Sequence, residues 1–205
     1  MNLAFLASFI ALILVISVSI RKQNKRFIER ENAFWERERL SNSVRKKSLD
    51  NLDYIRIPLE RFPTHLLKDN PAVMSCIEIV EALTSQKIVN LTGYTNTDLK
   101  FEYGTANLAL LSEYDDNYTV LVRTLQKWAD ELINAGNKAE AAILMEFAIS
   151  TGTDIGRTYY LLAEYYVEAG KSRRIDDLIT TAEQLHSSKK NTIVKQLRES
   201  YPDVF

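Results

Sequence analysis

The sequence predicts an all-α protein built from an apolar N-terminal helix, a basic helical stalk and an acidic helical head. Three observations lead to this prediction. Residues 3–20 carry no charge, the next 27 residues are basic and contain neither glycine nor proline, and the head repeats an Ala-Gly pair after 34 residues, between stretches with helical spacing. Residues 88–91 alone suggest a short strand, and no second strand is evident to pair with it. We therefore expect an ordered loop there.

The apolar segment at residues 3–20, "LAFLASFIALILVISVSI", has the length of a membrane-spanning helix. Its helical length is about 27 Å, close to the hydrocarbon thickness of a bilayer, about 30 Å. Ser17 and Ser19 fit the small-residue pattern of a secretory cleavage site, but the positive charges follow the apolar segment instead of preceding it. We expect residues 1–20 to be a retained transmembrane helix.

Four basic residues, Arg21, Lys22, Lys25 and Arg26, follow the apolar segment directly. By the positive-inside rule they place the bulk of the chain in the cytoplasm, as a single-pass protein of the cell membrane. The same cations can lie against anionic lipid headgroups, where each contributes on the order of 1 kcal/mol. A short chain with one such anchor is most often bacterial.

Residues 21–48 continue the apolar helix as a basic juxtamembrane stalk. This segment holds ten basic and four acidic side chains, a net charge of +6, and the rest of the chain after it has a net charge of −7. Phe27 and Phe34, like Ile28 and Trp35, are seven residues apart, which is the spacing of a coiled coil. The pattern covers fewer than three heptads, so it is compatible with a homo-oligomeric stalk and equally with a solvated one.

Residues 49–70 form the expected linker between stalk and head. Pro58 and Pro63 exclude a regular helix, so we expect extended chain whose apolar side chains pack on the head. The head begins with Asn70, which suits a helix cap, and Pro71, which suits the first helical turn.

The head, residues 71–205, reads as a series of helices. A loop with a short helix beginning near Thr97 leads to a helix over 105–114, and Asp115-Asp116 at its end read as caps or surface charge. From Asn117 the pattern becomes regular, and the short connections suit antiparallel neighbours. The helical patterns of this part cover residues 118–136, 138–151, 155–170, 173–187 and 191–201.

Residues 34 apart in this regular part are alike. The matched pairs are Leu125/Tyr159, Trp128/Leu162, Ala129/Ala163, Leu132/Tyr166, Ala135/Ala169, Gly136/Gly170, Ala141/Ile175, Met145/Ile179 and Ala148/Ala182. A large–small pair in the first helix, a glycine at the turn and a small–large–Ala series in the second helix resemble the tetratricopeptide repeat. The resemblance covers units at 117–150 and 151–187 with a capping helix at 188–201, and it implies an α-solenoid of antiparallel helix pairs.

In that family the first helix of each pair, helix A, lines a concave face that binds extended or helical peptides. The resemblance places this face here on Arg123, Gln126, Lys127, Asp130, Ile133, Asn134, Arg157, Tyr160, Glu164 and Val167. Arginine and tyrosine are good anchors for a peptide. The family's Lys/Asn clamp for an acidic C-terminus is not matched, because Gln126 and Asp130 stand at the corresponding positions.

These features predict a membrane-anchored adaptor or scaffold that binds a peptide or protein partner on the cytoplasmic side. The alternative is a structural subunit of a membrane complex. In that case the linker "YIRIPLERFP" fills the groove, and the anchor helices pair through Ala7 and Ala11, which have small-xxx-small spacing.

The chain shows no pattern of a catalytic, metal or cofactor site. His65 and His186 are the only histidines and are far apart in sequence, and Cys76 is the only cysteine, within a helical apolar pattern that predicts burial. No phosphate-binding glycine loop or nucleophile elbow is present. The one basic segment adjoins the apolar helix and the head is acidic, so we expect no enzyme activity and no nucleic-acid partner.

Overall fold

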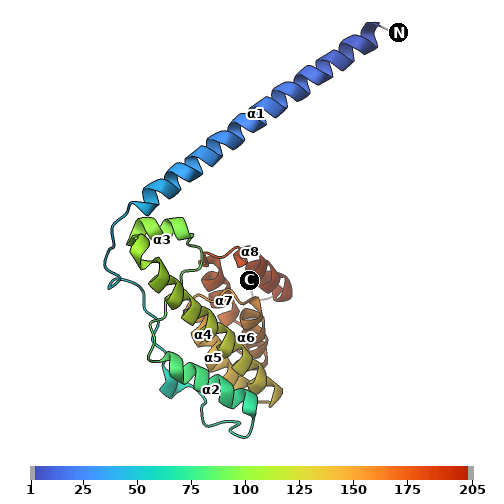
Figure 1. The fold of residues 1–205 in the computed structure, drawn as a ribbon. Coiled ribbons are helices and arrows are strands. Elements are labelled where there is room, and N and C mark those ends of the chain that lie inside the picture. Colours follow the sequence, from blue (N-terminus) through green and yellow to red (C-terminus); the bar gives the residue numbers. More distant parts are fainter. Residues whose placement is uncertain (1–2, 203–205) are drawn as a thin grey trace. The chain divides into compact units, whose positions relative to one another are not determined.

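The computed structural model describes the backbone of residues 3–202 and the side chains of residues 12, 13 and 16–202. Within these residues every regular element is an α-helix or a short 3-10 helix, which confirms the all-α class. The chain divides into two compact units (Figure 1). Unit 1 holds the residues up to 47 together with 95–108, and unit 2 holds residues 48–94 and those from 109 onward.

Unit 1 is built on α1 (Leu3–Asn42), a single helix of 40 residues. The predicted helical stalk over 21–48 is too long, because regular helix ends at Asn42. Ser43 and Val44 still donate backbone bonds three residues back, as in a tightened last turn. The backbone N–H of Lys47 then pairs with the carbonyl of Tyr103 at 3.0 Å, so the chain leaves the helix to bond with another segment of unit 1.

Most of the predicted membrane span at residues 3–20 lies outside the described side chains, as do Ala7 and Ala11. In the part of the chain that the structure does describe, no helix combines the length and the apolar character needed to cross a membrane.

The short helix α3 (Asn96–Tyr103) packs against the C-terminal part of α1. Thr95 caps it in a capping box with Asp98, and a 3-10 turn, η2 (Thr105–Asn107), follows. Glu38 of α1 accepts bonds from Lys100 and, at 2.7 Å, from Thr97. The predicted continuous head over 71–205 does not anticipate this arrangement, since residues 95–108 belong to unit 1.

A second ion pair of unit 1 joins Arg37 to Asp98, with 2.5 Å between Nη2 and Oδ1. Hydrogen bonds from Lys100 lower the pKa of Glu38, and those from Thr95 lower the pKa of Asp98. Both carboxylates are therefore charged at neutral pH, and both contributions are lost as the pH falls through these lowered pKa values. We call the contacts of α3 with Arg37 and Glu38 the α1–α3 clasp.

Unit 2 contains the linker, with a 3-10 turn η1 (Leu59–Arg61), and the remaining helices. As predicted, Asn70 caps the first of them by accepting bonds from the N–H groups of Ala72 and Val73, and Pro71 occupies the first turn. Cys76 is buried as expected. The helices are α2 (Pro71–Leu83), α4 (Leu108–Asn134, of which Leu108 belongs to unit 1), α5 (Lys138–Ser150), α6 (Gly156–Glu168), α7 (Arg174–Glu183) and α8 (Lys190–Ser200).

Helix α4 runs without interruption for 27 residues, so the predicted break near Asp115-Asp116 is wrong. Leu111, Tyr114 and Tyr118 carry the buried stripe straight through this point. Asp115 does not cap a helix; its carboxylate accepts the backbone N–H of Leu91 at 3.0 Å and ties the preceding loop, which is ordered as expected, to the helix.

The chain reverses direction after α4 and after α6 in the same way. Gly136 and Gly170 have φ of +84° and +69°, which confirms the predicted left-handed corners. At each corner the residue after the glycine donates to a carbonyl five residues back, Asn137 to Leu132 at 2.8 Å and Lys171 to Tyr166 at 2.7 Å. The two corners are therefore equivalent.

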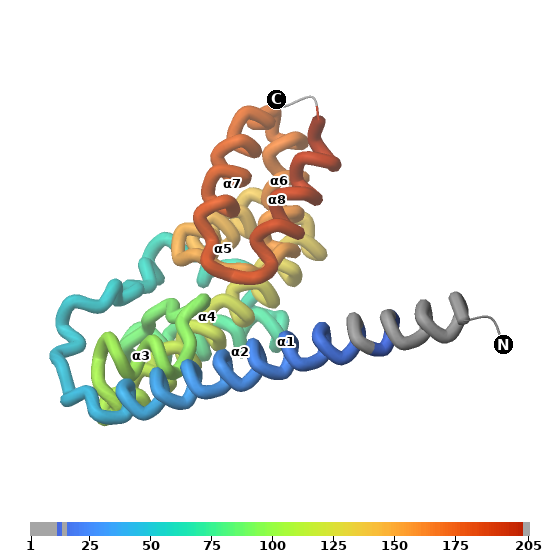
Figure 2. Tube along the Cα trace, turned by 90° about the horizontal axis from the view of Figure 1, so that it is seen from above, coloured from blue at the N-terminus to red at the C-terminus, as the bar shows by residue number. Residues whose placement is uncertain are grey.

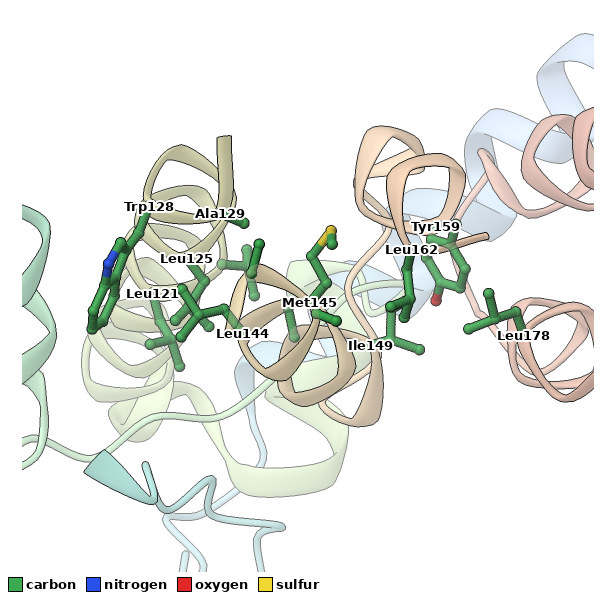
Figure 3. Close-up of a cluster of buried hydrophobic side chains, with 14 of the residues drawn as sticks. Leu121, Leu125, Trp128, Ala129, Leu144, Met145, Ile149, Tyr159, Leu162 and Leu178 are labelled. Carbon is green, nitrogen blue, oxygen red and sulfur yellow. The ribbon is translucent and has the colours of Figure 1, made fainter. Parts of the chain in front are cut away.

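The core of unit 2 runs through α4, α5, α6 and α7 (Figure 3). Of the matched pairs 34 residues apart, all except the exposed corner residues Ala135/Ala169 and Gly136/Gly170 are buried in both members. Each pair puts a large buried side chain next to a small one, Trp128 before Ala129 and Leu162 before Ala163, and Figure 3 shows Trp128, Ala129 and Leu162 in this core. The two helix pairs thus pack through equivalent residues, and α7 and α6 also contact α8 (Figure 2).

The linker packs on unit 2, as its apolar residues predict. Phe62 is 4% exposed and lies edge-on to both Trp128 of α4 and Phe147 of α5, at centroid distances of 6.1 and 5.3 Å. Ile55 donates its backbone N–H to the carbonyl of Ile88 at 2.9 Å. The linker is thereby a packed part of the unit.

Replacing Gly170 by alanine should lower the free energy of unfolding by about 1 kcal/mol, because alanine must then adopt a left-handed backbone conformation. No atom lies within 4 Å of the added Cβ, so a clash does not contribute. Asparagine, which tolerates this conformation better, should lose less. Chemical denaturation of the full-length variants in detergent micelles measures both free energies of unfolding. An alanine variant as stable as the wild type would contradict the left-handed backbone conformation at residue 170.

The α1–α3 clasp predicts a local effect of Lys100→Gln. Loss of this cation should speed amide hydrogen exchange over residues 96–103 several-fold and leave α5 and α6 unchanged, because these helices belong to unit 2. Arg39→Gln is the matched control, since Arg39 pairs only with Glu36 within α1. Lowering the pH through the lowered pKa values of Glu38 and Asp98 should also speed exchange over residues 96–103. The measured rates are first corrected for the pH dependence of intrinsic amide exchange. Equal exchange in both variants would rule out the clasp.

Candidate interaction surfaces

The predicted binding face of α4 keeps two free cations. Arg123 and Lys127 are exposed and lie one helical turn apart. Within the described residues, neither side chain has an ion pair or a hydrogen bond. Both side chains are therefore accessible from solvent.

Three other residues predicted for this face hold α4 and α6 together instead. Gln126 is only 9% exposed; its Nε2 donates to Asp130 at 3.0 Å, and its Oε1 accepts from the buried hydroxyl of Thr158 at 2.6 Å. Arg157 pairs with Asp130, with 3.0 Å between Nε and Oδ1. The prediction of Gln126 as a partner-binding residue must be corrected, because burial between the helices consumes its polar groups.

The remaining predicted positions differ in accessibility. Asn134 is exposed at the end of α4, and Tyr160 is half-buried, so that burial raises its pKa. Glu164 is exposed and borders a cavity of about 40 Å³ beside Leu161 and Tyr165, which has room for water but not for a peptide side chain. This small cavity is therefore no peptide site. Of the two apolar positions, Ile133 packs against the core and Val167 is exposed.

The four predicted membrane-flank residues, Arg21, Lys22, Lys25 and Arg26, are exposed on α1. Lys25 makes one long pair with Glu29, at 3.9 Å between Nζ and Oε1. A surface pair of this length contributes little, so it does not compete strongly with an anionic lipid headgroup.

The aromatic anchor of the linker contacts residues outside the predicted groove positions of α4. This anchor, Phe62, contacts Trp128, which lies about 100° around α4 from Lys127 and about 140° from Arg123. Phe147, the second contact, belongs to α5. Neither contact residue is among the predicted groove positions.

A second surface, which the sequence reasoning missed, runs along the solvent side of α5. Three hollows of about 230, 440 and 190 Å³ adjoin one another there. The first and second share Phe147 and Ser150, and the second and third share Glu146 and Ser150. We call the three hollows together the α5 trough. The linker lines one wall with Arg56, Pro58, Arg61 and Phe62, and α7 lines the other with Arg174, Asp177, Leu178 and Thr181.

The signal for this surface is present in the sequence of α5. The predicted buried stripe of this helix consists of Ala141, Leu144, Met145 and Ala148. Ile143 and Phe147, one turn apart, lie outside that stripe and are nevertheless apolar. A helix with apolar residues on nearly all sides needs either a second neighbour or a binding partner.

Charged groups around the trough are partly neutralised. Glu146 accepts from Arg174 at 2.7 Å and from the hydroxyl of Tyr166 at 2.8 Å, and the Arg174 guanidinium also lies over the Tyr166 ring. Burial, with the neighbouring Glu146 carboxylate, raises the pKa of Tyr166, so this phenol stays protonated. Arg56 and Arg61 are exposed and have no ion pair among the described residues.

Comparisons of the chain with protein-family models, with curated proteins and with solved structures find no match. Among the described residues, no three His, Cys, Asp or Glu side chains gather in a way that would hold a metal ion.

The different contributions of Gln126 and the exposed Lys127 to the stability of the fold can be measured. Thr158→Val leaves the buried Oε1 of Gln126 without its donor, which should lower the free energy of unfolding by about 1–3 kcal/mol. Lys127→Ala should change it by less than about 0.5 kcal/mol, because Lys127 is exposed and makes no hydrogen bond or ion pair within the described part of the chain. Denaturant unfolding of both full-length variants tests this, and equal losses would contradict the separate roles.

Proposed function

We propose that this chain is a membrane-anchored helical adaptor that binds an acidic segment of a protein partner at the exposed face of α4. Residues 3–20 span the membrane, and the basic flank from Arg21 to Arg26 holds the bulk of the chain at the anionic cytoplasmic surface. The role is that of a scaffold, with no catalytic step and no cofactor.

The observation that carries this proposal is the free pair of cations on α4. Arg123 and Lys127 stand one turn apart and exposed, whereas Asp130 and Arg157 on the same face neutralise each other. The uncompensated charge of the face is therefore positive although unit 2 as a whole is acidic. Carboxylates of a partner segment would form charge-assisted hydrogen bonds with these two side chains.

The tetratricopeptide-like arrangement is part of the proposal. The equivalent corners at Gly136 and Gly170 and the shared burial of residues 34 apart support it. In such an arrangement α4 and α6 are the A helices, which places Arg123 and Lys127 on the face that binds peptides in that family.

One observation favours a second function, that of a structural subunit which associates with copies of itself. Phe27, Ile28, Phe34 and Trp35 of α1 are exposed large apolar side chains at the spacing of a coiled coil. Residues 27 and 34 are seven positions apart, as are residues 28 and 35. The exposed apolar strip on α1 is therefore two residues wide. Pairing of two stalks would bury it.

Site-specific photo-crosslinking in native membranes tests the adaptor and its alternative together. A crosslinking residue at position 123 or 127 should capture the same protein, and the captured peptide should be acidic by mass spectrometry. The matched control position is Lys195 on α8, which is exposed and has only one long pair, with Glu199 at 3.7 Å. Sodium carbonate extraction should leave the full chain, but not residues 21–205, in the membrane fraction.

Two results would contradict the adaptor. One is the absence of adducts at both 123 and 127; the other is the same adduct from position 195. Adducts of twice the chain mass from position 27 or 34, with none from α4, would establish the structural subunit instead.

A further inference from the structure

We propose that the α5 trough is a second binding site, for an extended peptide segment that carries a bulky apolar side chain and a carboxylate. This site is separate from the proposed partner face of α4. Its floor is the solvent side of α5, its walls are the linker and α7, and all of its residues belong to unit 2.

The dimensions of the trough suit a short extended segment. Residues 143–150 of α5 cover a length of about 12 Å, which equals roughly four residues of extended chain. The largest hollow, about 440 Å³, can hold an apolar side chain, and it shares two lining residues with each of the two smaller hollows. The linker already lines this face, with Arg56 at one of the smaller hollows and Pro58, Arg61 and Phe62 at the largest.

The floor of the trough is apolar and already formed. Ile143 is 40% exposed, and Phe147 is half-buried against Phe62. Phe62 is fixed by its edge-on contacts with Trp128 and Phe147, and the Ser150 hydroxyl is bonded to the Phe147 carbonyl at 2.7 Å. A ligand would therefore bury apolar surface without first rearranging the wall, which favours binding.

Charge decides the chemistry of the ligand. The central hollow is bordered by one free charge, Arg61, because Glu146 is already bonded to Arg174 and Tyr166. A guanidinium beside an apolar hollow recognises a carboxylate by paired hydrogen bonds. Arg56 and Asp53 both border the adjoining hollow, where their charges balance, and Asp177 borders the third hollow, so the carboxylate of a ligand is expected at the central hollow, beside Arg61.

The probe for this site is the tetrapeptide acetyl-Asp-Ala-Phe-Ala-amide, with acetyl-Asn-Ala-Phe-Ala-amide as its uncharged counterpart. Binding is followed in the full-length chain in nanodiscs, with ¹³C-labelled isoleucine methyl groups observed by NMR. Ile143 reports on the trough. Ile79 of α2 is the matched reference, because it is 39% exposed and does not border the trough.

The expected result is a saturable shift of the Ile143 methyl signal with Ile79 unchanged, and about fivefold tighter binding of the aspartate peptide than of the asparagine peptide. Arg61→Gln should abolish that preference without loss of folding, since Arg61 is exposed. Lys68→Gln, an equal change of charge at another exposed position of the linker, should preserve it.

Each of four other results would overturn the proposal: no shift at Ile143, equal shifts at Ile143 and Ile79, equal affinity of the two peptides, or an unchanged preference in Arg61→Gln. A shift of Ile143 with protein concentration alone would likewise overturn it, because the occupant would then be a second copy of the chain. None of these results bears on Arg123 and Lys127, so the adaptor proposal stands or falls separately.

Discussion

The antiparallel packing of the helices in unit 2 depends on tight turns in which the chain reverses its direction within two residues. After α4 and again after α6, a glycine with positive φ lets the next N–H reach a carbonyl five residues back, and the following helix then lies antiparallel to the first. This tight reversal places α5 beside α4 and allows Ala141 and Ala148 to be buried. The buried series from Trp128 to Leu178 follows from it.

The sequence predicts well those features that depend on neighbouring residues in the chain. The corners at Gly136 and Gly170, the cap at Asn70 and the burial of Cys76 all follow from local patterns and are found in the structure. Paired aspartates after Tyr114 suggested a helix end, but the buried stripe of α4 continues through them. Burial of apolar residues along a whole helix outweighs a local preference for caps and turns.

Features that depend on distant partners could not be predicted. Lys100 meets Glu38 across 62 positions, and nothing near either residue marks the other. Gln126 looks like a surface residue until Thr158 covers it, 32 positions later. The α5 trough needs both the linker and α7 as walls, so only the exposed apolar pair Ile143 and Phe147 hinted at it. On α4 the sequence therefore indicated the exposed positions Arg123 and Lys127, but not the hydrogen bonds and ion pair that join Gln126, Asp130, Arg157 and Thr158.

Because Phe62 of the linker packs on Trp128, the fluorescence of Trp128 depends on the position of the linker. The indole N–H of Trp128 is buried and has no hydrogen-bond acceptor among the described residues, although such groups usually find one. An indole shielded from water in this way emits at a shorter wavelength than a hydrated one, whereas Trp35 is 60% exposed. Detachment of the linker would admit water to Trp128 and shift its emission to the red. Once Trp35 is replaced, the intrinsic fluorescence of Trp128 can therefore show whether the linker is packed on α4 or detached from it.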